Sequence, residues 1–153
     1  MKQNRNEESL KLLESKLINS LTEIQAILLS MIDIAHKENR NNDASVYADI
    51  SEKTAKLYEL WDFNLYTAWF QLAICRKDTD KCIEILNDMV LAMKKPWNIS
   101  KTNLYKHIKT KENEDDLGKM MVKMAISELQ NNEELAFLTK DMRLKELKKK
   151  FEV

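Results

Sequence analysis

The scarcity of glycine and proline limits the folds open to this chain more than any other feature. One glycine and one proline occur in 153 residues, whereas average usage is roughly 7% and 5%. Tight β-hairpin turns need residues with positive φ and depend on glycine, so a β-rich fold is excluded. With 44% hydrophobic and 33% charged residues, the chain has the composition of a folded domain. We therefore predict an all-α fold, a single antiparallel helical bundle over 1–153 with about five to seven helices.

A long amphipathic helix is predicted within residues 1–40, from about Glu7 to Glu38. Its apolar side chains recur every seven residues in two offset sets, which places them on one stripe. The stripe contains Leu10, Leu17, Ile24 and Met31 together with Leu21, Leu28 and Ala35, and it is widened by Leu13, Ile27 and Ile34. Such a stripe indicates either a helix packed inside its own bundle or the seam of a homodimer.

The central segment, 43–95, is predicted to hold a second helix, or two coaxial helices, from Asp43 to Arg76, followed by a third helix. The stretch KENRNNDAS separates the first helix from the second, because Asn, Asp and Ser favour turns. Asp78 is the expected N-cap of the third helix, and Pro96 cannot continue it.

The C-terminal segment, 96–153, has the least regular pattern. We expect a short helix around Asn103–Ile108, a longer one over Asp115–Leu129, a short one at Glu133–Leu138 and a basic one at Asp141–Phe151. The spacing of apolar residues in the longer helix predicts four inward-facing side chains, Leu117, Met121, Met124 and Leu129.

Residues 57–75 are the most densely apolar part of the chain. On a wheel of about 100° per residue, one stripe contains Leu57, Trp61, Leu65, Ala68, Leu72 and Cys75, and the opposite one contains Phe63, Tyr66, Phe70 and Ile74. A helix that is apolar nearly all round is normally enclosed by other elements. We therefore predict that this stretch is the central helix of the domain, with Asn64, Thr67 and Gln71 as its only coherent polar strip.

The stretch AWFQLAICRKDTDKCIEILNDM, residues 68–89, resembles a tetratricopeptide-type helical hairpin. The resemblance implies that Ala73 lies where the first helix is closely approached, and that Cys82, Leu86 and Met89 face inward from the second. Its turn is about two residues shorter than the 34-residue repeat requires, the usual glycine is missing, and no second copy follows at that period.

The same resemblance implies a binding surface, because tetratricopeptide-like pairs place their first helix on a concave face that binds ligands. Asn64, Thr67 and Gln71 would then line a groove. Asn and Gln side chains can pair with the backbone of an extended peptide through one donor and one acceptor. The alternative interpretation is that this strip is the solvent edge of a buried helix.

A second resemblance covers the chain from Leu60 onward. LYKHIKTKENEDD and ELAFLTKDMRLKEL are similar to the C-terminal helical region of Firmicute Xre-type helix-turn-helix regulators. This resemblance implies a sensor or partner-binding module. Residues 1–40 have one long amphipathic pattern without a short basic recognition helix, so no DNA-reading motif is recognised there.

No catalytic, cofactor or metal site is predicted. Cys75 and Cys82 are seven residues apart, whereas structural zinc sites pair ligands about two to four residues apart. Asp33 and His36 supply only half of the carboxylate–histidine set of a di-metal bundle. A single glycine excludes phosphate-cradling loops. Nothing in the sequence marks either cysteine as activated, and a Cys–His nucleophile pair, whose members meet only in space, stays open as an alternative. We therefore expect no enzymatic activity.

The charge balance and the length of the apolar runs indicate where in the cell the protein is located. The 25 basic and 25 acidic side chains cancel, so the net charge does not favour nucleic acid or anionic membranes as partners. No signal peptide is recognised, and the run YTAWFQLAIC is about half as long as a membrane-spanning helix. The lysines of 141–151 are interpreted as a solvated face. These features predict a cytoplasmic protein with reduced cysteines and no membrane association.

The sequence thus favours a non-catalytic interaction or sensor module that binds a peptide or protein partner, within bacterial regulation if the second resemblance holds. Two alternatives stay open. One is a nucleic-acid-associated transcriptional regulator or accessory protein. The other is a helical protein that binds a small molecule in a pocket formed by the aromatic side chains.

Overall fold

The computed structural model describes residues 2–109 and 114–151, which contain seven α-helices, three short 3-10 helices and no strand. The α-helices are α1 (Lys2–Lys37), α2 (Asn41–Leu57), α3 (Thr67–Cys75), α4 (Thr79–Lys94), α5 (Glu114–Asn131), α6 (Ala136–Thr139) and α7 (Met142–Phe151). The 3-10 helices are Asp62–Leu65, Ile99–Lys101 and Glu133–Leu135. The predicted all-α fold is confirmed.

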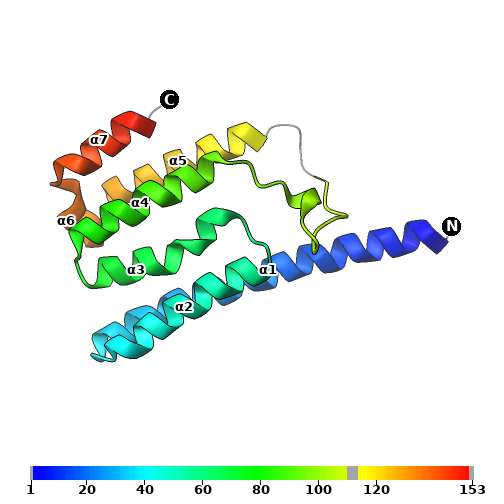
Figure 1. Ribbon diagram of the computed structural model, residues 1–153, viewed down its shortest axis with the longest axis horizontal. Coiled ribbons are helices and arrows are strands. Elements are labelled where there is room, and N and C mark those ends of the chain that lie inside the picture. The colour runs from blue at the N-terminus through cyan, green and yellow to red at the C-terminus, as the bar shows by residue number, and fades with distance from the viewer. Residues whose placement is uncertain (1, 110–113, 152–153) are drawn as a thin grey trace.

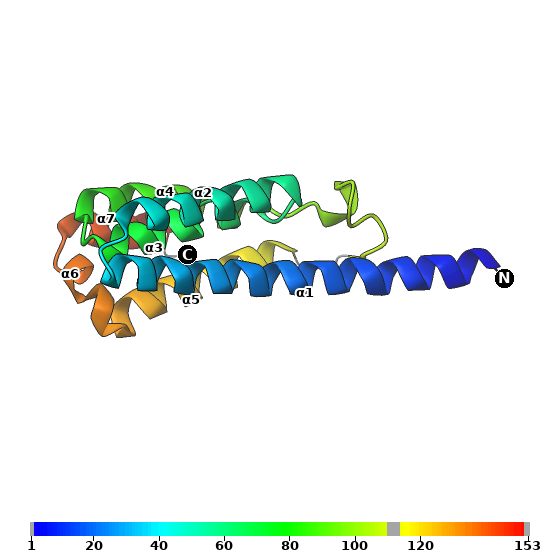
Figure 2. The ribbon, with the colours of Figure 1, turned by 90° about the horizontal axis from the view of Figure 1, so that it is seen from below.

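The helices form a chain of packed neighbours. α1 and α2 make an antiparallel hairpin, α3 packs on both, α4 runs back along α3, and α5 and α7 pack on α4 (Figure 1). In the edge-on view of Figure 2, α2 and α4 lie in one layer, α1 and α5 in the other, and α3 lies between them. The N-terminal part of α1 extends beyond the rest of the chain, and residues 2–13 are all exposed.

The prediction of a second helix, or two coaxial helices, running to Arg76 is wrong. α2 ends at Leu57, Glu59 takes a left-handed φ of 52°, and the Leu60 N–H donates to the Ala55 carbonyl at 3.0 Å. The chain then reverses, so that α3 packs antiparallel on α2 rather than continuing it. Leu57, expected inside, is therefore 73% exposed.

Three helices end on a left-handed residue that is not glycine. Asn39, Glu59 and Lys77 have φ of 59°, 52° and 50°. In each case the next N–H donates to a carbonyl five residues earlier, as in Asp78 to Ala73 at 3.0 Å, which is the hydrogen-bond pattern of a Schellman cap. A left-handed conformation costs an ordinary L-residue roughly 1–2 kcal/mol. Because glycine is scarce, these three helix ends use other residues in a conformation that strains them.

Replacing Lys77 with glycine is expected to stabilise the fold by about 0.5–1 kcal/mol, because glycine removes the Cβ strain at some cost in unfolded-chain entropy. Lys77 is exposed and has no ion-pair partner among the side chains of residues 2–109 or 117–151, so little else changes. Urea unfolding would measure the difference. Lys77→Ala keeps the Cβ atom and is the control; an equal gain from alanine would contradict the strain account.

The largest buried cluster is built around α4, with α5, α6 and α7 packed on it. The positions predicted to face inward from residues 68–89, Ala73, Cys82, Leu86 and Met89, are all buried. Asp78 caps α4 by accepting from the Lys81 N–H at 3.2 Å, as predicted, and the helix ends at Lys94, before Pro96.

The predicted inner face of α5 is partly wrong. Leu129 is buried, but Leu117 and Met124 are exposed. A Cβ atom at Gly118 would lie 2.6 Å from the Met93 carbonyl oxygen. Gly118 therefore marks a close approach of α5 to α4, and with this side of α5 against α4, Leu117 and Met124 face solvent.

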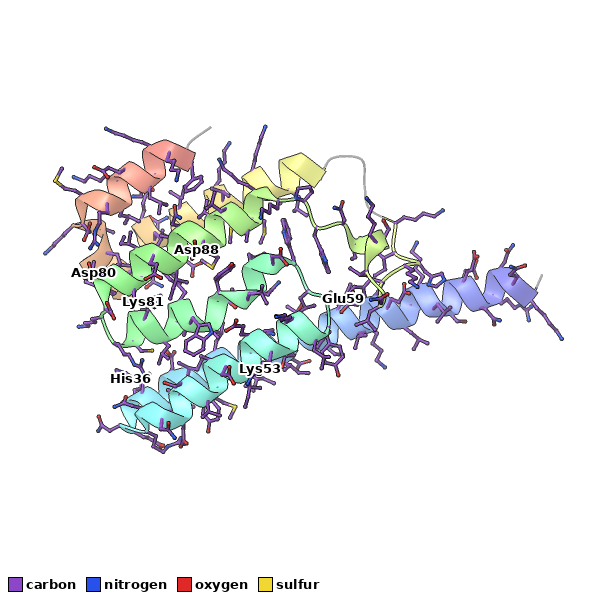
Figure 3. All side chains as sticks on the ribbon, viewed as in Figure 1. His36, Lys53, Glu59, Asp80, Lys81 and Asp88 are labelled. Atoms are coloured by element: carbon purple, nitrogen blue, oxygen red, sulfur yellow. The ribbon has the colours of Figure 1, made fainter. Side chains whose placement is uncertain are left out.

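The segment after α4 is not helical at 103–108, contrary to the prediction. Its backbone N–H groups bond to carboxylates of other elements instead of helical carbonyls. Glu59 accepts from the N–H groups of Asn103 and Leu104 at 2.9 and 3.2 Å, and Glu14 accepts from that of His107 at 3.0 Å. Figure 3 shows Glu59 beside this segment. The C-terminal prediction held better: the 3-10 helix Glu133–Leu135 with α6, and then α7, lie where helices were expected.

Candidate functional site

The predicted polar strip is divided between two elements. Asn64 lies in the 3-10 helix, where its side-chain amide donates to the Trp61 carbonyl at 2.9 Å. The Thr67 hydroxyl donates to the Asn64 carbonyl at 3.3 Å. The Gln71 amide donates to Asp33 Oδ1 on α1 at 2.6 Å. The first two side chains thus support the start of α3, and the third connects α3 to α1.

Thr67 and Gln71 also line a groove. A cavity of about 250 Å³ has α1 and α5 at its sides and α3 and α4 beneath. Its apolar lining includes Leu29, Phe63, Phe70, Ile74, Leu86, Met89, Met93 and Leu129. Asn64 is not part of this lining. The predicted strip therefore contributes two of its three residues to a cavity whose other walls come from helices distant in sequence.

A second cavity of about 490 Å³ adjoins the first and shares Gln71, Ile74 and Glu134 with it. Asp33 and His36 line it from α1, and His36 lies near the end of α3 in Figure 3. The His36 Nδ1 atom is buried without a hydrogen-bond partner in the described residues. Gln71 lines both cavities, and its hydrogen-bond partner Asp33 lines the second one.

The two thiols are held in their neutral form. Burial and the neighbouring Asp33 carboxylate raise the pKa of Cys75 to about 12, and burial raises that of Cys82 to about 11. A reactive cysteine needs the opposite shift, since the thiolate is the nucleophile. No group of three His, Cys, Asp or Glu side chains is arranged to hold a metal ion in residues 2–109 and 117–151, where side chains are described. The expectation of a non-catalytic protein stays a prediction.

The apolar stripe predicted on α1 separates into two faces. One face is buried against α2 and α3 and contains Leu21, Leu28, Ile32 and Ala35. Its Gln25 donates to the Ser51 carbonyl and accepts from the Ser51 hydroxyl, a buried polar pair between α1 and α2. The other face, which we call the α1 seam, consists of Leu10, Leu13, Ile24, Ile27, Met31 and Ile34. These six side chains are 37% to 61% exposed.

The spacing of the α1 seam is that of a coiled coil. With Leu10 at position a of a heptad, every seam residue falls at a or d, and Leu17 and Ser20 fill the two intervening positions. The buried residues Leu21, Leu28 and Ala35 fall at e. The periodicity was visible in the sequence, but which of two adjacent faces turns inward was not.

The energy available from the α1 seam suits a reversible complex. Full burial of a Leu, Ile or Met side chain contributes about 1.5–3 kcal/mol, so burying the exposed half of each contributes about half of that. Twelve such side chains in a symmetric pair would give roughly 9–18 kcal/mol before an association cost of roughly 4–15 kcal/mol. A complex through this face alone is therefore expected to be weak and concentration-dependent.

By length and composition α1 could also cross a membrane, and it is the one such helix in the described residues. This differs from the expectation, based on residues 66–75, that no segment is long enough. Core helices and signal sequences meet the same criterion. The packed face of α1 carries the Gln25–Ser51 pair, whose buried polar groups satisfy each other against α2 within the chain.

No protein family, characterised protein or solved structure gave a match to this chain.

Proposed function

We propose that this protein is a non-catalytic helical interaction module, and that it binds a helix of a protein partner along the α1 seam. A second copy of the chain is the first partner to test. The observation that carries the proposal is the exposure of six apolar side chains at a and d positions of one helix, two on one side of Leu17 and Ser20 and four on the other. Knobs-into-holes packing against a second helix is the ordinary way to cover such a face.

The projecting part of α1 supports the same proposal. Residues 2–13 contact no other element closely enough to be shielded, and they include the exposed Leu10, Leu12 and Leu13. Isolated helical segments of about this length are marginal in water. A partner helix along the seam would cover Leu10 and Leu13 and support the projecting turns, whereas Leu12 lies at position c, outside the seam.

Substitution of seam residues tests the proposal. Ile24→Lys combined with Ile27→Glu is expected to abolish self-association, because it places charges in the centre of the seam. Analytical ultracentrifugation over a wide concentration range would measure the effect. Both side chains are about half exposed, so the thermal unfolding midpoint should stay close to that of the parent.

The matched control uses α2, where Val46 and Ile50 are 45% and 44% exposed but form no heptad seam. Val46→Lys with Ile50→Glu should leave association intact. A parent chain that stays monomeric at every concentration would refute the second copy as partner. Seam-dependent flotation with lipid vesicles, in place of self-association, would assign α1 to a membrane.

A further inference from the structure

The groove between α1 and α5 differs in charge from a third cavity, which lies on the side of α4 and α5 that faces α7. The lining of the groove contains Glu128 and Glu134 and no lysine or arginine. The third cavity, of about 340 Å³, is lined by Lys94, Lys119 and Lys123 with no carboxylate. The chain thus presents two cavities of opposite sign, each with an apolar floor.

The carboxylates of the groove have no cationic partner. Neither Glu128 nor Glu134 forms an ion pair within residues 2–109 and 114–151. Asp33, at the junction with the second cavity, accepts only from the Gln71 amide and the Cys75 thiol in that part of the chain. Lys37 and Lys77 line the second cavity but not the groove itself. The groove therefore has an acidic rim that is not neutralised from within.

The floor of the groove suits a small apolar group. Phe63 and Phe70 supply aromatic faces, which attract cations through their quadrupoles. Met89 and Met93 are flexible and polarisable, so they adapt to ligands of different shape. Thr67 and Gln71 add a few polar groups to a mainly apolar wall, which is the usual make-up of a small-molecule site.

We propose that the groove between α1 and α5 binds a small amphiphilic cation, an alkyl- or arylammonium, with its apolar body over Phe70, Met89 and Met93 and its charge at the Glu128–Glu134 rim. A lipophilic anion lacks the complementary charge there and would be drawn to the lysine-lined cavity instead. The proposal concerns a different surface from the α1 seam, so it stands or fails independently of self-association.

Isothermal titration with two probes of equal tail length, octyltrimethylammonium and octane-1-sulfonate, both below their micelle concentrations, tests the proposal. At low salt, the ammonium should bind to the groove at least about tenfold more tightly than the sulfonate does. The positive charge of the ammonium complements the acidic rim, and the negative charge of the sulfonate does not. The double variant Glu128→Gln with Glu134→Gln should weaken ammonium binding about fivefold to tenfold, as expected for two exposed charge contacts. Both side chains are exposed, so this variant should fold.

The matched control is Glu8→Gln with Glu146→Gln, which removes two exposed carboxylates from α1 and α7 and should leave ammonium binding unchanged. Methyl NMR locates the ligand: the Met89 and Met93 signals should move on adding the ammonium, and that of the exposed Met142 should not. Absence of ammonium binding, equal binding of both probes at the groove, or full affinity in the groove variant would each overturn the proposal.

Discussion

Replacing Tyr105 with alanine is expected to destabilise the fold by about 3–5 kcal/mol, the range for removing a large buried aromatic side chain. Tyr105 is completely buried, and its ring packs edge-on against Trp97 with centroids 5.9 Å apart. Its hydroxyl donates to the Tyr58 carbonyl at 2.5 Å. The residue therefore anchors the non-helical segment after α4 to the end of α2, and a cavity there cannot collapse easily.

Tyr105→Phe separates packing from hydrogen bonding. It keeps the ring and should cost only about 1–2 kcal/mol, because the Tyr58 carbonyl loses its donor. Denaturant unfolding of both variants would measure the difference. A cost for Tyr105→Ala below that for Tyr105→Phe would contradict the packing account.

The same phenol gives a pH signature. Burial, with a smaller contribution from the Glu59 carboxylate, raises the pKa of Tyr105 to about 12, against about 10 in an unfolded chain. Between these values the unfolded chain loses the proton first, so the stability that Tyr105 confers is complete below pH 10 and declines toward pH 12. Tyr105→Phe should show a shallower decline over this range than the parent.

Gly118→Ala is the second substitution with a large expected effect. It should destabilise the fold, although helix propensity alone favours alanine over glycine. In a helix interior alanine is favoured over glycine by about 1 kcal/mol. Here the new Cβ atom would lie 2.6 Å from the Met93 carbonyl oxygen, so α5 and α4 must move apart. Overpacking of this kind costs about 1–3 kcal/mol, and a shift away from a backbone atom lies toward the upper end. We expect a net loss of about 1–2 kcal/mol.

The control is Ser127→Ala on the same helix, at an exposed position, which should be neutral or slightly stabilising. Thermal unfolding monitored by circular dichroism would compare the two variants. A gain in stability for Gly118→Ala would show that α5 does not approach α4 this closely.

Local patterns in the sequence were sufficient for much of α4. Asp78 marked its start, Pro96 followed its end, and the resemblance to a tetratricopeptide-type hairpin placed Cys82, Leu86 and Met89 on its buried face. These features depend on groups within a few residues of each other. The break after Leu57 had no such signal, because Glu59 adopts the left-handed conformation normally marked by glycine. That turn is supported by contacts with distant segments: α3 packs back onto α2 and α1, and Glu59 accepts from the N–H groups of Asn103 and Leu104.

The candidate sites also have some features that local sequence predicts and others that depend on tertiary contacts. The sequence singled out Thr67 and Gln71 as polar residues on an apolar helix. It could not show that Gln71 would meet Asp33, 38 residues away in the chain, or that α5 would form the opposite wall of a groove. The seven-residue repeat of α1 was likewise plain, but two adjacent apolar faces share that periodicity. Which of them is buried depends on where α2 packs.

By itself, then, the sequence determined the all-α fold, because a chain with one glycine lacks the residues that tight β turns require. It also determined the faces of those helices whose ends carry clear signals. The tertiary structure alone decided which apolar face of α1 stays exposed, which helices frame the groove, and where Gly118 is needed. Those outcomes depend on contacts between distant segments, and helical periodicity specifies the side of a helix without specifying its neighbour.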